Sequence, residues 1–208
     1  MKRKLFWIGV PALILLVSMA YLLIAGERDA AQVRQNVLRF HVVANSNSSA
    51  DQALKLKVRD GVFALIEQLF ADCGSQEEAL ETARLNQERL AEEGTRILRE
   101  NGKDEPVQVL IGTRWFPTKQ YGDLSFPAGQ YQAVSIAIGE GAGENFWCVL
   151  YPALCVAPAV AEAECDQEMA AVVGEGSTAF LKKNDQKQQI KFALVEWFEN
   201  IRQKFMKS

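Results

Sequence analysis

The sequence has only one histidine, His41, among 208 residues, and only four cysteines. A metal site or hydrolase mechanism that requires two histidines is therefore excluded within one chain. The cysteines show no C-x-x-C spacing, so a zinc ribbon or a thioredoxin-like redox motif is excluded as well. With so few histidines and cysteines, few catalytic mechanisms are available to the chain. The sequence predicts neither a metal nor a cofactor.

Two nucleophile arrangements can still be written down. His41 could pair with Cys148, but both lie in predicted strands and no oxyanion-hole motif accompanies them. A serine–lysine pair could be drawn from Ser46 or Ser48 with Lys55 or Lys57. Because the serines precede a helix and are better explained as its caps, we expect a protein that is not an enzyme.

The chain also lacks the excess of positive charge that nucleic-acid binding normally requires. Its formal net charge is −3, with 23 basic and 26 acidic residues. Hydrophobic residues make up 49% and charged residues 24% of the chain, close to the average for globular proteins. This composition excludes a disordered chain and a many-pass membrane protein.

Charge is absent altogether from Leu5 to Gly26, a run of 22 residues. As a helix this run would span about 33 Å, roughly the thickness of the bilayer hydrocarbon. Three basic residues, Lys2 to Lys4, precede it, so the positive-inside tendency predicts export of everything after Glu27. Residues 1–28 are therefore predicted to be a signal peptide or a transmembrane anchor, and the sequence leaves open which of the two.

All four cysteines follow this run, on the side where disulfides can persist. Cys148 and Cys155 enclose a short segment that contains Pro152, and a bridge between them is expected. Two buried free thiols are the alternative. Cys73 and Cys165 lie in a predicted helix end and a connector, where no functional pairing is expected.

Hydrophobic periodicity divides the exported part into helices and strands. A strand over 38–44 is followed by a helix that ends near Phe70, with Ser48 at capping-box distance from Asp51. A second helix is predicted from Ser75 to Asn101. After Pro106 the period changes to two, which predicts three strands, over 107–111, 131–138 and 146–150. The fold class is therefore α+β, an antiparallel sheet of about four strands covered by helices.

The predicted organisation has three parts after the N-terminal segment. Residues 29–155 form the α+β core of the exported domain, and residues 156–185, rich in Ala, Glu and Gly, form a connector. Residues 186–208 form a C-terminal amphipathic helix whose apolar positions recur every three or four residues. We expect this helix to pack on the core; the alternative is a tail that binds a partner through its apolar stripe.

The segment from Arg114 to Ala128 is the most promising binding element. It joins two predicted strands and is rich in aromatic rings, basic residues and proline. Aromatic and arginine anchors on a rigid loop are typical of protein-recognition surfaces. The partner-binding candidates are Arg114, Trp115, Phe116, Lys119 and Tyr121. The alternative is a small core in which these rings fold beneath the loop.

Three stretches of the sequence resemble a known family. They are HVVANSNSSADQALKLKVRDGV (41–62), FPTKQYGDLSFPAGQYQAVSIAIGEGAGENFWCVLYPALC (116–155) and IKFALVEWFENI (190–201). Together they resemble stage II sporulation protein R of endospore-forming bacteria. The departures are mild: Phe146 stands where a tryptophan is expected, and Ala153 where a second proline is expected.

The resemblance implies a sporulation signalling protein with no catalytic activity of its own. Such a protein is made in the forespore and exported into the space between forespore and mother cell. There it activates a membrane-embedded receptor protease of the aspartic type, which cleaves the precursor of the mother-cell sigma factor E. An exported cell-wall-associated hydrolase or wall-binding domain is the alternative function. The implied partners are the receptor protease and, through residues 5–26, the membrane, with no nucleic acid and no small-molecule substrate.

Overall fold

The computed structural model describes residues 2–153, 162–182 and 186–206. The chain divides into two compact units that are interleaved along the sequence. The sheet unit contains Arg34–Phe116 and Gln130–Val172, and the anchor unit contains Met1–Val33, Pro117–Gly129 and Val173–Ser208. This division cuts the predicted 29–155 core, because its 117–129 segment belongs with the N-terminal and C-terminal helices.

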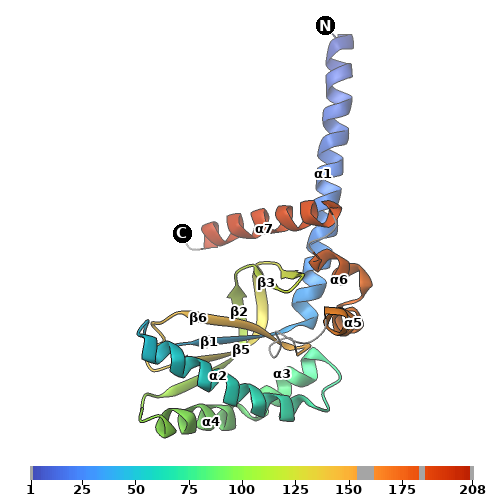
Figure 1. Cartoon of the computed structure of the whole chain (residues 1–208). Coiled ribbons are helices and arrows are strands. Elements are labelled where there is room, and N and C mark those ends of the chain that lie inside the picture. Colours follow the sequence, from blue (N-terminus) through green and yellow to red (C-terminus); the bar gives the residue numbers. More distant parts are fainter. Residues whose placement is uncertain (1, 154–161, 183–185, 207–208) are drawn as a thin grey trace. The chain divides into compact units, whose positions relative to one another are not determined.

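The sheet unit is built on a four-stranded sheet of order β2-β5-β1-β6 (Figure 1). Its strands are β1 (Leu38–Val43), β2 (Val107–Phe116), β5 (Gly129–Ile138) and β6 (Asn145–Tyr151). Strand β1 is central, parallel to β5 and antiparallel to β6. The predicted α+β class is confirmed, and the predicted antiparallel sheet holds except for the one parallel pair.

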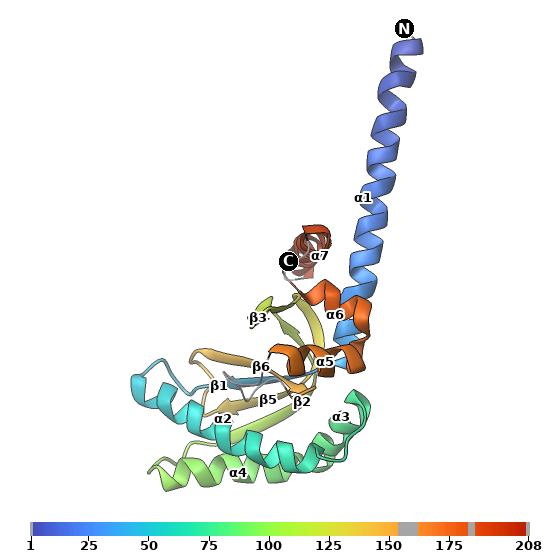
Figure 2. The ribbon, with the colours of Figure 1, turned by 45° about the vertical axis from the view of Figure 1, so that its right-hand side comes forward.

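Three helices cover one face of this sheet, as Figure 2 shows: α2 (Ser49–Phe70), α3 (Gln76–Leu85) and α4 (Gln87–Glu100). Alternate residues of β1 and the apolar stripe of α2 face one another, and Leu38, Phe40, Val58 and Val62 are fully buried in the resulting core. The predicted start of α2 is confirmed, because the Ser48 hydroxyl accepts a hydrogen bond from the Asp51 amide at 3.1 Å.

The predicted single helix from Ser75 to Asn101 is wrong, because the chain breaks at Asn86 into α3 and α4. The Asn86 side chain donates to the carbonyl of Thr82 at 2.9 Å, and its backbone amide also donates to the last turn of α3. An asparagine side chain that competes for backbone groups in this way ends one helix and lets the next begin at a new angle.

The segment 114–128 is also not the loop that the sequence predicted. Strand β2 continues to Phe116, so Arg114 and Trp115 lie on a strand. The rest forms a small hairpin in the anchor unit, in which β3 (Lys119–Tyr121) pairs antiparallel with β4 (Leu124–Phe126) around Gly122. Gly122 has a φ of 54°, a left-handed conformation that glycine adopts without strain.

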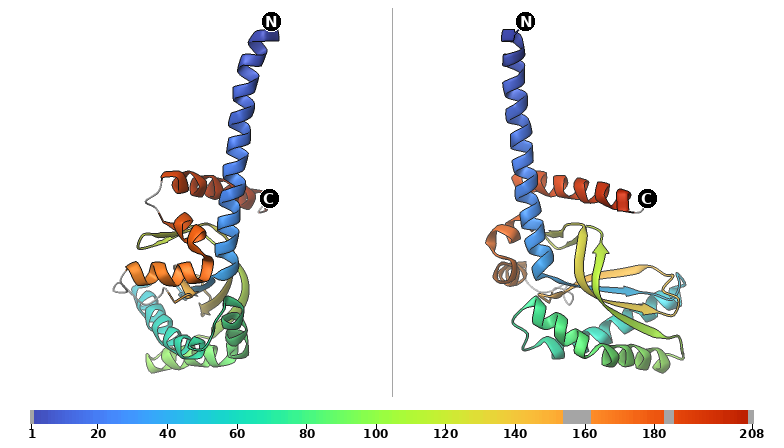
Figure 3. Two further views of the ribbon diagram at one scale, coloured as in Figure 1. Left: turned by 90° about the vertical axis from the view of Figure 1, so that its right-hand side faces the viewer. Right: turned by 180° about the vertical axis from the view of Figure 1, so that it is seen from behind.

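The anchor unit contains the long helix α1 (Lys2–Asn36) as far as Val33, the hairpin, α6 (Glu175–Leu181) and α7 (Gln186–Met206) (Figure 3). Within α1, the stretch Val10–Asn36 is long and apolar enough to cross a membrane. Most of its apolar side chains are exposed, including those from Leu13 to Val17. An N-terminal apolar helix of this kind fits association with a membrane.

Two predictions for the C-terminal third need correction. In place of the 156–185 connector, the described residues there form α5 (Glu162–Val173) and α6. Helix α7 is present, but the apolar stripe that was predicted to pack on the core is largely exposed. The helix is held instead through Val195 and Glu199, which are buried, and through a contact between the rings of Phe192 and Phe180 on α6.

Candidate functional site

The ANSNSS stretch, which follows β1, forms a hydrogen-bonded junction with the start of α2. The carboxylate of Asp51 accepts from the Ser46 hydroxyl at 2.6 Å and from the Asn45 side-chain amide at 3.3 Å. The Ser46 hydroxyl donation is the main cause of a pKa below the usual value for Asp51. Lys103 lies 3.7 Å from the same carboxylate and lowers its pKa further. The motif therefore stabilises the strand-to-helix connection.

The glycine-rich turn 139–143 packs directly on this junction. The Asn45 side-chain oxygen accepts from the backbone amide of Glu140 at 3.0 Å, and the amide of Gly143 donates to the carbonyl of Ala44 at 2.9 Å. A β-carbon on Gly143 would lie 2.4 Å from the backbone oxygen of Ser46, closer than real contacts allow. The turn therefore has a packing role.

Arg39 lies on the sheet face opposite the helices and is fully buried. Its guanidinium carbon stands 4.6 Å from the ring centre of Phe116 and 4.9 Å from that of Tyr131, and its Nε donates to the carbonyl of Cys148 at 2.9 Å. Such cation–π contacts hold a charge that would otherwise be costly to bury. The rings of strands β2 and β5 are thereby tied to the central strand.

His41 lies two residues further along the same face and is half-buried. Its ring stacks on that of Trp147 with 4.0 Å between centroids and 9° between planes. One ring nitrogen lies 2.6 Å from the side-chain oxygen of Asn145. Burial lowers the pKa of His41, and the nearby positive charge of Arg114 lowers it further, against the opposing effect of Asn145. The imidazole is therefore kept mostly neutral at neutral pH.

This arrangement rules out a Cys–His dyad of His41 and Cys148. Cys148 pairs with Phe40 across the β1–β6 ladder and belongs to the core beneath the helices. His41 pairs with Trp147. Because side chains alternate between the two faces of a sheet, the thiol and the imidazole point to opposite faces. Cys148 is moreover disulfide-bonded, whereas Cys73 is a free cysteine.

The predicted partner of Cys148, Cys155, lies outside the described residues, so the Cys148–Cys155 bridge stays a prediction. The serine–lysine alternative finds no support in the contacts of the lysines. The Lys55 ammonium donates to the Gln52 side chain at 2.6 Å and to the carbonyl of Glu144 at 3.1 Å. Lys57 donates to Asn101. Lys55 thus joins α2 to the chain before β6, and Lys57 joins α2 to the end of α4.

The five partner-binding candidates have different environments. Phe116 is fully buried beneath Arg39 and cannot serve as an exposed anchor, whereas Arg114 is exposed on β2. Trp115 is half-buried. Lys119 and Tyr121 belong to the hairpin of the anchor unit and are half-buried there.

The Tyr121 ring lies at 5.6 Å, edge to face, from that of Phe126. The rings therefore divide between the predicted small core and an accessible surface.

Sequence reasoning missed two residues on the sheet face opposite the helices: the buried Arg39 and the half-buried Trp147. We define the sheet-face patch as Arg114, His41 and Trp147. Side chains alternate along β1, so Arg39 and His41 share one face, and this alternation is the signal that the sequence offers. The pairing of His41 with Trp147 depends on the register of two strands about a hundred residues apart, which no local pattern reveals.

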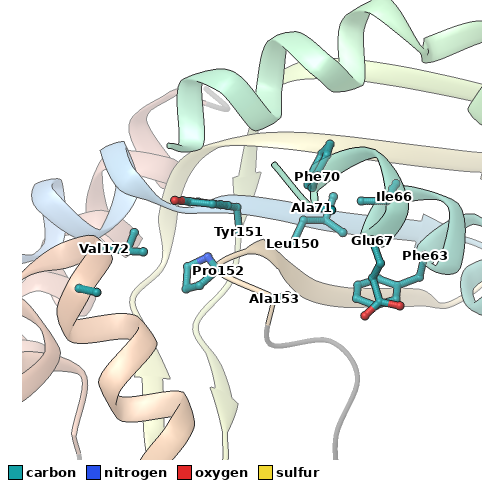
Figure 4. Close-up of a pocket in the computed structure, with 11 residues that line it drawn as sticks. Phe63, Ile66, Glu67, Phe70, Ala71, Leu150, Tyr151, Pro152, Ala153 and Val172 are labelled. Atoms are coloured by element: carbon teal, nitrogen blue, oxygen red, sulfur yellow. The ribbon is translucent and has the colours of Figure 1, made fainter. Parts of the chain in front are cut away.

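The sheet unit also contains an apolar pocket of about 400 Å³ between α2, the end of β6 and α5 (Figure 4). Phe63, Phe70, Leu150 and Tyr151 are among the residues that line it, and Glu67 is the acidic one. Its lining reaches Ala153, next to residues 154–161, which are not described. Among the described residues, no three His, Cys, Asp or Glu side chains could hold a metal ion together.

Comparison with known proteins connects these features to a family. The model of the family described as stage II sporulation protein R matches residues 34–161. The stage II sporulation protein R of Bacillus subtilis (strain 168) is 31% identical over 191 residues, which cover 84% of this chain and 85% of that protein. The chain belongs to the stage II sporulation protein R family. No solved structure matches it.

The matched range of the sporulation protein R family contains the hydrogen-bonded junction at Asp51, the glycine turn and the sheet-face patch. It also contains the hairpin with Lys119 and Tyr121. The part of α1 before Arg34 and all of α7 lie outside it.

Proposed function

We propose that the chain is an exported sporulation signal that binds and activates a membrane-embedded, aspartic-type receptor protease. Activation leads to processing of the precursor of the mother-cell sigma factor E. Family membership supports the sporulation role, and the apolar helix α1 supports delivery to the membrane on which such a receptor resides. The protein would act in the space between forespore and mother cell, either anchored by residues 5–26 or released after their cleavage.

Binding alone is sufficient for such a signal. A receptor that exchanges between inactive and active states shifts toward the active one when a ligand binds that state more tightly. The hydrogen bonds of the sheet unit support this mode, because the groups that resemble catalytic residues are engaged in structure. His41 is stacked and kept mostly neutral, Ser46 bonds Asp51, and Lys55 joins α2 to the chain before β6.

The observation that carries the proposal is the sheet-face patch. The exposed cation of Arg114 lies near the flat His41–Trp147 stack, and this combination of arginine with aromatic surface is what protein interfaces favour. Stacked rings keep their conformation before binding, so little side-chain entropy is lost when they are covered. On the hairpin, Lys119 and Tyr121 remain a second candidate contact.

The test is a reconstituted pathway in a non-sporulating bacterium that expresses this chain, the receptor protease and the sigma precursor. Processing is followed by immunoblot for Arg114→Glu, with Arg89→Glu as the matched control, since Arg89 is also exposed but lies on α4. Loss of a true anchor costs about 2 kcal/mol of binding, roughly thirty-fold in affinity. We expect slow processing for Arg114→Glu alone, at equal export and thermal stability.

Two outcomes would contradict the proposal. Normal processing by Arg114→Glu and by a Lys119→Ala, Tyr121→Ala double variant would exclude both contact surfaces. Turnover of a cell-wall substrate by the purified protein would instead favour the hydrolase alternative. His41→Ala is the companion test for chemistry: a variant that stays folded and binds the receptor normally, yet fails to signal, would reopen the question of catalysis.

A further inference from the structure

Helix α7 exposes a continuous apolar stripe. The exposed fractions are 55% for Ile190, 59% for Trp197, 47% for Phe198 and 79% for Phe205. Leu194 and Ile201 are partly exposed. With 3.6 residues per turn, these six positions fall within one arc of about 100° on the helix. Large side chains rarely gather on a soluble surface in this way without a binding role.

The stripe is not simply a core face that failed to dock. The opposite side of α7 is already buried, through Val195 and Glu199. The Glu199 carboxylate pairs with the Arg202 guanidinium at 3.2 Å, and the Phe192 ring lies 5.5 Å from that of Phe180. The anchor unit therefore fixes the helix by its other face and presents the stripe outward.

The charge of this segment differs in sign from that of the whole protein. Residues 186–208 contain five basic and two acidic residues, a net charge of +3, in a chain whose net charge is −3. Arg202 and Lys204 are exposed on the helix that carries the stripe. Tryptophan and phenylalanine on one side with basic residues beside them are typical of helices that lie in the headgroup region of anionic membranes.

The same unit contains the helix α1, whose apolar stretch is exposed and long enough to cross a membrane. In both views of Figure 3, α7 runs across the direction of α1. When α1 spans a bilayer, a helix that runs across it can lie along the membrane surface. We propose that α7 is an interfacial helix that inserts its apolar stripe into the anionic membrane beside the anchor.

The test uses the full-length protein, reconstituted in vesicles, with an environment-sensitive fluorophore on a single introduced cysteine. Phe198→Cys reports the stripe, and Asn200→Cys, two residues away on the polar side of α7, is the matched control. Both carry Cys73→Ser and Cys165→Ser, and the labelled protein with these two substitutions and no added cysteine gives the background. Vesicles contain phosphatidylcholine with or without phosphatidylglycerol, and lipids with a nitroxide near the headgroup serve as quenchers.

We expect quenching of the Phe198→Cys label in phosphatidylglycerol vesicles, with little quenching at the Asn200→Cys position. Adding Lys204→Gln removes one exposed charge, worth about 1 kcal/mol near an anionic surface, so the docked-to-undocked ratio should fall about five-fold. High salt should act in the same direction.

Two results would overturn the proposal. One is equal exposure of both labels to water in anionic vesicles. The other is protection of the Phe198→Cys label that depends on protein density and not on lipid charge, which would mean that a second copy of the chain covers the stripe.

Discussion

The packing of the glycine turn on the Asn45–Ser46 backbone can be tested with Gly143→Ala. The added β-carbon would lie 2.4 Å from the backbone oxygen of Ser46 and 2.8 Å from the β-carbon of Ala44. Neither atom can rotate away, because one belongs to the main chain and the other is fixed to it. The 139–143 turn must therefore move away from the strand end, or the strand end must distort.

The cost can be worked out from three contributions. Overpacking of one methyl group in a close contact costs about 1–3 kcal/mol. Movement of the turn would also stretch the hydrogen bonds from Gly143 to Ala44, at 2.9 Å, and from Ala142 to Asn45, at 3.2 Å, each worth about 1 kcal/mol. Alanine also lowers the conformational entropy of the unfolded chain, which stabilises the folded state by about 0.4–1 kcal/mol. We expect a net loss of about 2–5 kcal/mol in the free energy of unfolding.

The measurement is urea unfolding of the full-length protein in detergent micelles, followed by tryptophan emission. Trp7 and Trp197 are replaced by phenylalanine in every variant, so that the emission reports on Trp115 and Trp147 of the sheet unit. The control is Gly74→Ala in the same unit, where the nearest atom to the new β-carbon is a side-chain oxygen of Glu78 at 3.6 Å. This control should be neutral or slightly stabilising. A Gly143→Ala variant that unfolds at the same urea concentration as wild type would refute the close approach.

Three further predictions follow from the same structure. In the folded protein His41 has a pKa below its usual 6.5, so the unfolded state binds the proton more readily. The free energy of unfolding should therefore rise with pH up to about 6.5. In urea titrations, His41→Gln should remove this rise. Peptide mapping without reductant should recover Cys148 joined to Cys155, and recovery of a bridge to Cys165 would contradict this pairing. A reporter that is active only after export, fused after Ser208, should be active, whereas activity of a cytoplasmic reporter at the same place would contradict the topology.

Local patterns were sufficient for several elements. Ser48 and Ser75 were recognisable as caps because each hydroxyl bonds an amide only three residues away, at Asp51 and Glu78. The strands and α2 could be located because alternation and the 3.6 period are recorded in neighbouring residues. The apolar run from Leu5 to Gly26 was equally clear, since its length and lack of charge need no tertiary partner.

The predictions that failed were those that depended on distant neighbours. The break at Asn86 and the split of the 114–128 segment between two units are not visible in periodicity, because both depend on how the chain packs. The sequence located the apolar stripe of α7 correctly. It also predicted that the stripe packs on the core, whereas the stripe is largely exposed. Amphipathicity shows that a helix has an apolar side, but it does not show what that side contacts.

The sequence by itself therefore determined the α+β class, the caps, the apolar N-terminal run and the small supply of catalytic residues. Only the tertiary structure decided that Arg39 is buried against Phe116 and Tyr131, that His41 stacks on Trp147, and that His41 and Cys148 face opposite sides of the sheet. The physical reason is the separation along the chain of the groups that interact. Caps and apolar stripes involve residues that are only three or four positions apart. Strand register, in contrast, joins groups about a hundred residues apart, through contacts that exist only once the chain has folded.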